Sequence, residues 1–161
     1  MTERLYLEDL SVGQRFESAT HLLTAEDIKR FAAAYDPQPF HLDEEAAKKS
    51  LFGSLAASGW HTGAVTMRLL VEGGAPIAGG VIGAGGEIAW PRPTRPGDEL
   101  QVFSEVTDIV PSRSKPDRGI VQAETTVSNQ AGEAVLRFKA KLMVPKLEFA
   151  PRVHTHKQEN L

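Results

Sequence analysis

The chain changes its hydrophobic pattern near Gly79. Before this glycine, apolar residues recur at the three- and four-residue spacing of amphipathic helices. After it, β-branched residues, alternation and turn signals replace that spacing. The first part therefore predicts helices, and the second part predicts an antiparallel sheet. Helices that precede an unbroken run of strands are typical of an α+β fold, in which the sheet packs on the helices.

Three helices are predicted before Gly79. The first covers residues 24–35, where Thr24 can cap the helix and Asp27 stands in the position of a capping-box acid. A short second helix, residues 43–49, can be capped by Asp43. The third, residues 59–71, is apolar or small on nearly every side, so we expect it to be buried. Its apolar stripe comprises Ala64, Met67, Leu70 and Val71.

Five strands are predicted, at residues 14–23, 81–90, 99–110, 119–128 and 134–144. The sequence from Asn129 to Gly132 favours a hairpin turn between the last two. We expect a long antiparallel sheet wrapped around the central buried helix, in a single domain of residues 1–148. The polar residues 149–161 are expected to form an extension, and the last three letters also begin a common protease-cleavage tag.

The composition excludes several classes of function. The 161 residues carry a formal net charge of -3 and have no basic stripe, so we expect no nucleic-acid partner. The chain has no cysteine, which excludes disulfides, thiolate metal sites and a cysteine nucleophile. Because it also has no apolar run of about 18 residues and no secretory signal, we expect a cytoplasmic protein without a membrane partner.

The stretch from Asp36 to Asp43 carries the candidate chemistry. Asp36 and His41 lie in a proline-stiffened loop directly after the first helix, and rigid loops hold reacting groups well. Adding water to an activated double bond requires one group that takes a proton from water and one that gives a proton to carbon. A carboxylate and an imidazole can divide these tasks. Taken alone, Asp36 or His41 is better explained by a role in local structure than by catalysis. Asp43 is better explained as a helix cap.

Ser58 and Gly59 begin the third helix. A glycine here lets a ligand approach backbone N–H groups at the positive end of the helix dipole. Donors of this kind can stabilise the oxygen of an enolate. Ser58 can cap the helix or orient the pocket, and we do not assign it as a nucleophile.

These segments, in this order, resemble the MaoC-like, or (R)-specific enoyl-CoA hydratase, family of the hot-dog fold. The resemblance covers the chain to about Pro145. It rests on Tyr35-Asp36, His41-Leu42-Asp43, Ala46-Ala47, Phe52-Gly53, Ala57-Ser58-Gly59, Gly85-Gly86-Glu87, Trp90-Pro91, Pro93 and Pro96-Gly97-Asp98. Each piece is a weak signal, but their order and spacing together are specific.

The resemblance implies reversible hydration of a 2-enoyl thioester. Asp36 and His41 would then activate the water, and the Gly59 N–H would bind the oxyanion; which member of the pair handles the water is left open. The resemblance implies no metal and no separate cofactor, because CoA or a carrier-protein pantetheine arrives as part of the acyl substrate. It also implies a homodimer or a higher homo-oligomer.

Several residues are weaker candidates for substrate binding. Many relatives have His-Gly at the start of the third helix, whereas this chain has Ser58-Gly59 followed by Trp60 and His61, which are predicted substrate contacts or core residues. Gly85 and Gly86 can give a substrate arm a close approach to the sheet, or can mark a bulge. Arg92 and Arg95 can either contact CoA phosphates or form solvated surface. No metal site is predicted at His154 and His156.

Two other functions stay open. Related hot-dog proteins hydrolyse acyl-CoA thioesters with a carboxylate and water, and the release of a free thiol would identify that activity. A binding protein could instead keep the fold and the acyl pocket without turnover, and loss of the acid/base pair would mark it. Because Asp36 and His41 are both present, the sequence favours the hydratase.

Overall fold

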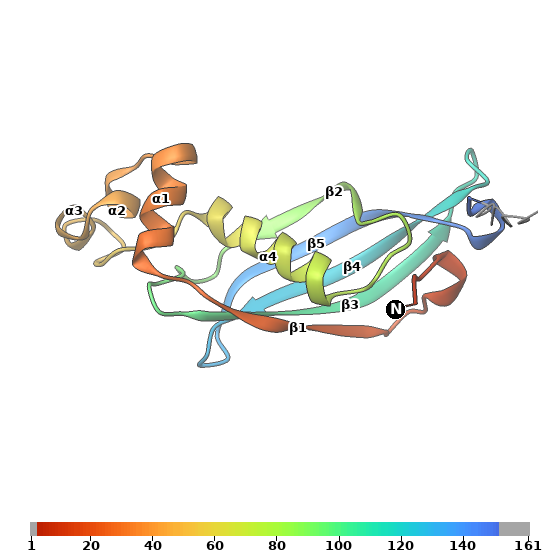
Figure 1. Cartoon of the computed structure of the whole chain (residues 1–161), viewed down its shortest axis with the longest axis horizontal. Coiled ribbons are helices and arrows are strands. Elements are labelled where there is room, and N and C mark those ends of the chain that lie inside the picture. Colours follow the sequence, from red (N-terminus) through yellow and green to blue (C-terminus); the bar gives the residue numbers. More distant parts are fainter. Residues whose placement is uncertain (1–2, 152–161) are drawn as a thin grey trace, which may run out of the picture.

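The structure of the chain is a computed structural model, which describes residues 3–151. A single antiparallel sheet has five strands in the order β1-β3-β4-β5-β2. The helix α4 lies across one face of this sheet, and the shorter helices α1 to α3 gather at one end of the molecule (Figure 1). The predicted α+β hot-dog fold is confirmed. The helices are α1 (Ala25–Tyr35), α2 (Pro39–Leu42), α3 (Glu44–Lys48) and α4 (Gly59–Gly73), and the strands are β1 (Arg15–Leu22), β2 (Ile82–Ala89), β3 (Glu99–Pro111), β4 (Arg118–Ser128) and β5 (Ala134–Pro145).

The predicted strands all form, and their bounds differ from the prediction by no more than one residue at either end. The hairpin turn between β4 and β5 also forms. Gly132 adopts a φ of 75°, and the Asn129 side chain accepts hydrogen bonds from the backbone N–H groups of Ala131 and Glu133. The predicted boundary of one domain at residue 148 stays a prediction.

Two helices are capped as the sequence predicts. The Thr24 hydroxyl accepts a hydrogen bond from the Asp27 N–H at 3.1 Å, and the Asp43 carboxylate accepts one from the Ala46 N–H at 2.7 Å. The capping box at α1 is incomplete, because the Asp27 carboxylate pairs with Arg30 instead of returning to the Thr24 backbone. These caps fix where α1 and α3 begin.

Helix α4 buries a different face from the predicted one. Met67 and Val71 are 43% and 65% exposed, whereas Thr62, Val65, Thr66 and Leu69 are buried. The threonines fit an apolar contact because their hydroxyls bond within the helix, as in the 2.7 Å hydrogen bond from Thr66 Oγ1 to the Thr62 carbonyl. Helix α4 is therefore buried on the side that faces the sheet, and the single chain leaves another, apolar side of it open.

Two clusters of buried apolar side chains hold α4 and the flanking segments to the sheet. One lies toward the α1 to α3 end and includes Leu23, Ile28, Val65, Leu100 and Leu136. The other lies toward the opposite end and includes Leu7, Ile77, Val106, Val121 and Val144. Among the described residues, no helix has the length and the apolar run that crossing a bilayer would require.

Candidate active site

Asp36 lies at the C-terminal end of α1. The helix ends at Tyr35, and the Asp36 backbone N–H still donates to the Ala32 carbonyl at 2.9 Å. Pro37 and Pro39 prevent the helix from continuing. The chain must therefore turn directly after Asp36, and this turn sets the direction of its carboxylate.

His41 lies on a short helix and not in a loop, which corrects the sequence prediction. Pro39 occupies the first helical position of α2, where a proline sacrifices no hydrogen bond and already has a helical φ. The α2 turn places the His41 side chain inside the protein, where the residue is 4% exposed. The rings of Phe40 and Phe52 pack around it, with centroid distances of 4.6 and 5.9 Å.

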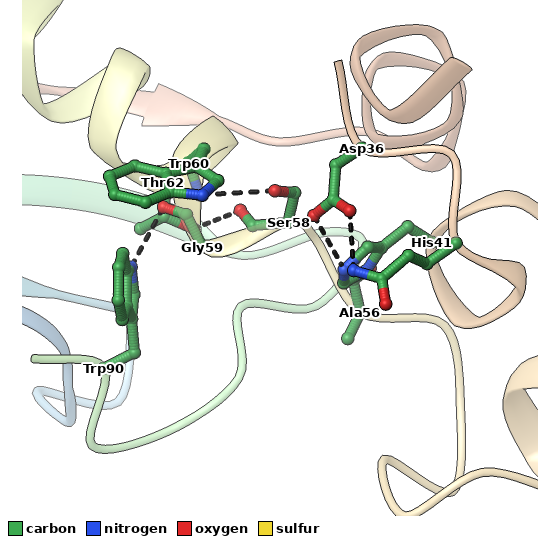
Figure 2. Close-up of polar contacts among 9 residues, drawn as sticks. Asp36, His41, Ala56, Ser58, Gly59, Trp60, Thr62 and Trp90 are labelled. Atoms are coloured by element: carbon green, nitrogen blue, oxygen red, sulfur yellow. Dashed lines mark hydrogen bonds and ion pairs between the residues drawn. The ribbon is translucent and has the colours of Figure 1, made fainter. Parts of the chain in front are cut away.

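The two candidate acid/base side chains face each other (Figure 2). His41 Nε2 lies 3.3 Å from Asp36 Oδ2, and His41 Nδ1 lies 2.6 Å from the carbonyl oxygen of Ala56. A carbonyl oxygen only accepts hydrogen bonds, so Nδ1 must carry a proton. Nε2 is therefore the ring atom that can exchange a proton with Asp36, with water or with a substrate.

The Asp36 carboxylate is held in its ionised form. Burial opposes this by favouring the neutral acid, but hydrogen bonds from Ser58 and Gln38, together with the attraction of the His41 ring when it is protonated, outweigh it, so that the pKa of Asp36 lies below its ordinary value. The Gln38 side-chain amide donates to Asp36 Oδ1 at 2.6 Å. At neutral pH the carboxylate can thus accept a proton or hold a water molecule.

Ser58 connects this pair to the start of α4. Its hydroxyl accepts a hydrogen bond from the Trp60 N–H at 3.3 Å, and the Ser58 side chain also contributes to the lowered pKa of Asp36. The Gly59 N–H makes no hydrogen bond within the described residues. Because the first N–H groups of a helix carry partial positive charge, this free donor can stabilise a negatively charged oxygen close to Asp36.

The Trp90 side chain packs against Gly59. The indole Nε1–H donates to the Gly59 carbonyl at 2.9 Å, and the ring meets that of Trp60 edge-on at a centroid distance of 5.4 Å (Figure 2). A Cβ atom at Gly59 would lie 2.7 Å from Cε2 of Trp90. The structure thus gives a further reason for a glycine at this position, since the indole fills the space that a side chain would need.

Asp36, His41, Gly59, Trp60 and Trp90 border one cleft with a volume of about 470 Å³, which Ser58 does not line. Such a volume lies within the range of small-molecule sites. The aromatic rings give the cleft apolar walls, and the polar groups converge at Asp36 and His41. Its lining residues are Asp36, Gln38, Phe40, His41, Phe52, Ala57, Gly59, Trp60, Thr62, Trp90, Pro91, Arg92, Pro93 and Thr94.

The other predicted site residues lie apart from this cleft. His61 is buried, and its ring stacks on Phe31 of α1 at a centroid distance of 4.6 Å. Gly85 and Gly86 lie on β2 at a bulge in its pairing with β5. A Cβ at Gly86 would lie 2.4 Å from the Lys139 carbonyl oxygen, so close strand packing requires this glycine. Contact of His61, Gly85 or Gly86 with a substrate stays a prediction, and His154 and His156 lie outside the described residues.

The burial of His61 predicts a pH dependence of stability. Burial lowers the pKa of His61, the charges of His21 and Arg30 lower it further, and Asp27 opposes them. As the pH falls below about 6.5, the unfolded chain takes up a proton that the folded chain resists, so His61 destabilises the fold at low pH. We expect the melting temperature of His61→Phe to fall less between pH 7.5 and 5.5 than that of the wild type. Equal decreases, measured by circular dichroism, would contradict this role.

Sequence reasoning missed two contacts that orient the pair. The acceptor for His41 is the backbone carbonyl of Ala56, and a backbone group leaves no signal in the residue types. Gln38 belongs to the candidate stretch from Asp36 to Asp43, but its hydrogen bond to Asp36 depends on how the turn folds. Trp90 was part of the family resemblance, but no contact was predicted for it. Its contact with Gly59 joins residues far apart in the sequence.

Comparison with known proteins identifies relatives along most of the chain. Residues 11–138 match the family described as "FAS1-like, dehydratase domain region". The chain is 31% identical over 148 residues to a 3-hydroxybutyryl-CoA dehydratase of Methylorubrum extorquens, and the match covers 91% of this chain and 88% of that protein.

Two solved structures extend these similarities to the fold. The MaoC-like dehydratase from Rhodospirillum rubrum has a TM-score of 0.87 and 61% identity, and the match covers 88% of this chain and 97% of that one. The R-hydratase PhaJ1 from Pseudomonas aeruginosa has a TM-score of 0.73 and 32% identity, over 89% of this chain and 87% of that one.

Proposed function

The chain belongs to the MaoC-like dehydratase family and is a hydro-lyase, and we propose that Asp36 and His41 are its acid/base pair. The proposed reaction is the reversible addition of water to a 2-enoyl thioester, which gives a 3-hydroxyacyl thioester. The observation that carries this proposal is the 3.3 Å approach of His41 Nε2 to Asp36 in a cleft that also contains the free N–H of Gly59. We propose that no metal or separate cofactor takes part.

In the hydration direction, the pair takes one proton from a water molecule while the water oxygen bonds to the β-carbon. The π electrons move toward the thioester carbonyl, and the resulting enolate oxygen accepts a hydrogen bond from the Gly59 N–H. The pair then delivers a proton to the α-carbon as the carbonyl re-forms. The ionised Asp36 and the free Nε2 of His41 suit these transfers because both can hold and release a proton.

The test of this function uses crotonyl-CoA, a 2-enoyl thioester. Hydration removes the conjugated double bond, so the ultraviolet absorbance of the enoyl thioester should fall while a thiol reagent detects no free CoA. A thioesterase would release the thiol, and a binding protein would leave both signals unchanged. Either of these results would overturn the proposal.

We also propose that the protein is a homodimer, in which a second copy covers the open face of α4 and the free edge of β2. Within the described residues, β2 pairs with β5 alone, and seven of its eight residues are exposed. The apolar residues Met67 and Val71 lie exposed on α4, and Ile82 on β2 is 50% exposed. An unpaired strand edge beside an exposed apolar helix face favours association with a matching surface.

Charges on this helix face should therefore dissociate the dimer. We expect the double variant Met67→Asp with Val71→Asp to elute with the mass of one chain in size-exclusion chromatography with light scattering, because dimer formation would bury two unpaired carboxylates per chain. The wild type should elute with the mass of two chains. A monomeric wild type, or a dimeric variant, would contradict the proposed interface.

A further inference from the structure

The side chain of Arg95 points inward onto the backbone of another segment. Its Nη1 donates to the carbonyl of Ser54 at 2.8 Å and to that of Leu55 at 3.3 Å, and its Nη2 donates to the carbonyl of Phe52 at 2.7 Å. Asp98 fixes the arginine in turn by accepting a hydrogen bond from the Arg95 backbone N–H at 2.8 Å. A planar guanidinium with several donors in fixed directions suits this use.

The segment that Arg95 holds has no helix or strand of its own between α3 and α4. Other contacts also fix it: the Ala57 N–H donates to the Thr94 carbonyl at 2.9 Å, the Ala56 N–H donates to the Phe40 carbonyl at 3.3 Å, and the side chains of Leu55 and Ala57 are buried in the core. Thr94, directly before Arg95, is buried and also receives a hydrogen bond from the Thr62 hydroxyl at 3.1 Å. Residues 94 and 95 thus make four hydrogen bonds to the backbone of residues 52–57, three from the Arg95 side chain and one at the Thr94 carbonyl.

This segment leads directly to the catalytic groups. The Ala56 carbonyl accepts the hydrogen bond from His41 Nδ1 at 2.6 Å, and Ser58 and Gly59 follow it in the chain. A displacement of the Ala56 carbonyl would free His41 to rotate or to move its proton from Nδ1 to Nε2. Nε2, the ring nitrogen that faces Asp36, would then be turned away or would already carry a proton, and it could not accept one there.

We propose that Arg95 is a positioning residue for His41, which acts by fixing the Phe52 to Ala56 backbone. The proposal rests on the proposed function for its kinetic test, but not for its structural one. The three hydrogen bonds to carbonyls also favour this role for Arg95, a half-buried residue, over contact with a phosphate. The neighbouring Arg92 points to a different partner, Glu133, at 3.0 Å.

The kinetic test compares Arg95→Ala, Arg95→Lys and the wild type with crotonyl-CoA. We expect kcat to fall about 100-fold in Arg95→Ala, with KM nearly unchanged, because a misplaced acid/base group costs rate more than binding. Added methylguanidinium should restore part of the lost kcat in Arg95→Ala. Arg95→Lys should lie between the two, because one ammonium group cannot reach all three carbonyls in the same geometry.

The matched control is Arg118→Ala, which removes a half-buried arginine that pairs with Asp117 outside the cleft. This variant should keep the wild-type kcat.

The structural test is NMR of the ring nitrogens of labelled histidine, with His41→Gln to assign the signal. In the wild type, the Nδ1–H of His41 should give a protected signal typical of a proton bound to a carbonyl. Arg95→Ala should lose this signal, whereas Arg118→Ala should retain it. A role in stability alone would lower the melting temperature but leave the His41 signal unchanged.

The outcomes separate this inference from the proposed function. Wild-type kcat in Arg95→Ala, or an unchanged His41 signal in that variant, overturns the role of Arg95 while leaving the hydratase proposal intact. If the wild type does not hydrate crotonyl-CoA but Arg95→Ala still loses the His41 signal, the positioning role stands and the hydratase proposal falls.

Discussion

Asp36→Asn is expected to lower kcat for the hydration of crotonyl-CoA by about 1000-fold, within the range that general acid/base groups contribute. Asparagine has nearly the same shape as aspartate but cannot accept or release a proton at these pH values. The variant would also lose the negative charge beside His41 Nε2, 3.3 Å away in the wild type. Steady-state kinetics with saturating substrate measure the effect directly.

The matched control for this variant is Asp43→Asn. Asp43 caps α3 through its bond to the Ala46 N–H and does not line the cleft. Asparagine caps a helix about as well as aspartate, so this variant should keep both the wild-type kcat and the wild-type melting temperature. Wild-type kcat in folded Asp36→Asn would remove Asp36 from the mechanism. An equal loss in Asp43→Asn would show that the effect is not specific to the proposed pair.

Gly59→Ala is expected to lower kcat by about 100-fold or more, which is the size of effect that follows the loss of one oxyanion donor. The reason is steric: the new Cβ would lie 2.7 Å from Cε2 and 2.9 Å from Nε1 of Trp90. Either the indole or the first turn of α4 must shift, and the Gly59 N–H would then be displaced from its proposed position beside the enolate oxygen. Kinetics on the purified variant would measure the loss.

Gly63→Ala is the control, because Gly63 lies on the same helix and a Cβ there would meet no atom within 4 Å. Its melting temperature should equal or exceed that of the wild type, since alanine favours a helix by about 1 kcal/mol over glycine. A second comparison adds Trp90→Ala to Gly59→Ala, which removes the clash and should recover part of the activity lost. Wild-type kcat in Gly59→Ala would contradict the assignment of this N–H as the oxyanion donor.

Local signals predicted much of the architecture. The caps at Thr24 and Asp43 and the turn at Asn129 to Gly132 depend on residues close in sequence, and the structure forms all three. The alternation after Gly79 likewise predicted strands that the structure contains. Such features can be deduced from one sequence because the interactions that stabilise them lie within a few residues.

Features that depend on tertiary packing were not predicted. Apart from Arg68 and Glu72, α4 carries apolar or small residues on most of its surface, so the pattern could not reveal that Thr62 and Thr66 would face inward while Met67 stayed open. The proline-rich stretch did not reveal the α2 turn that buries His41. The residue types of the proposed acid/base pair were visible in the sequence, but the backbone carbonyl of Ala56 that bonds to His41 was not.

The most direct test of the central claim is to follow crotonyl-CoA turnover by the wild type in water enriched in heavy oxygen, with mass spectrometry of the product. The account predicts an intact acyl-CoA with the heavy oxygen in a hydroxyl group at the β-carbon, formed by the wild type and not by Asp36→Asn. Heavy oxygen in the carboxylate of a free acid, together with released CoA, would contradict the account, because water would then have attacked the thioester carbonyl.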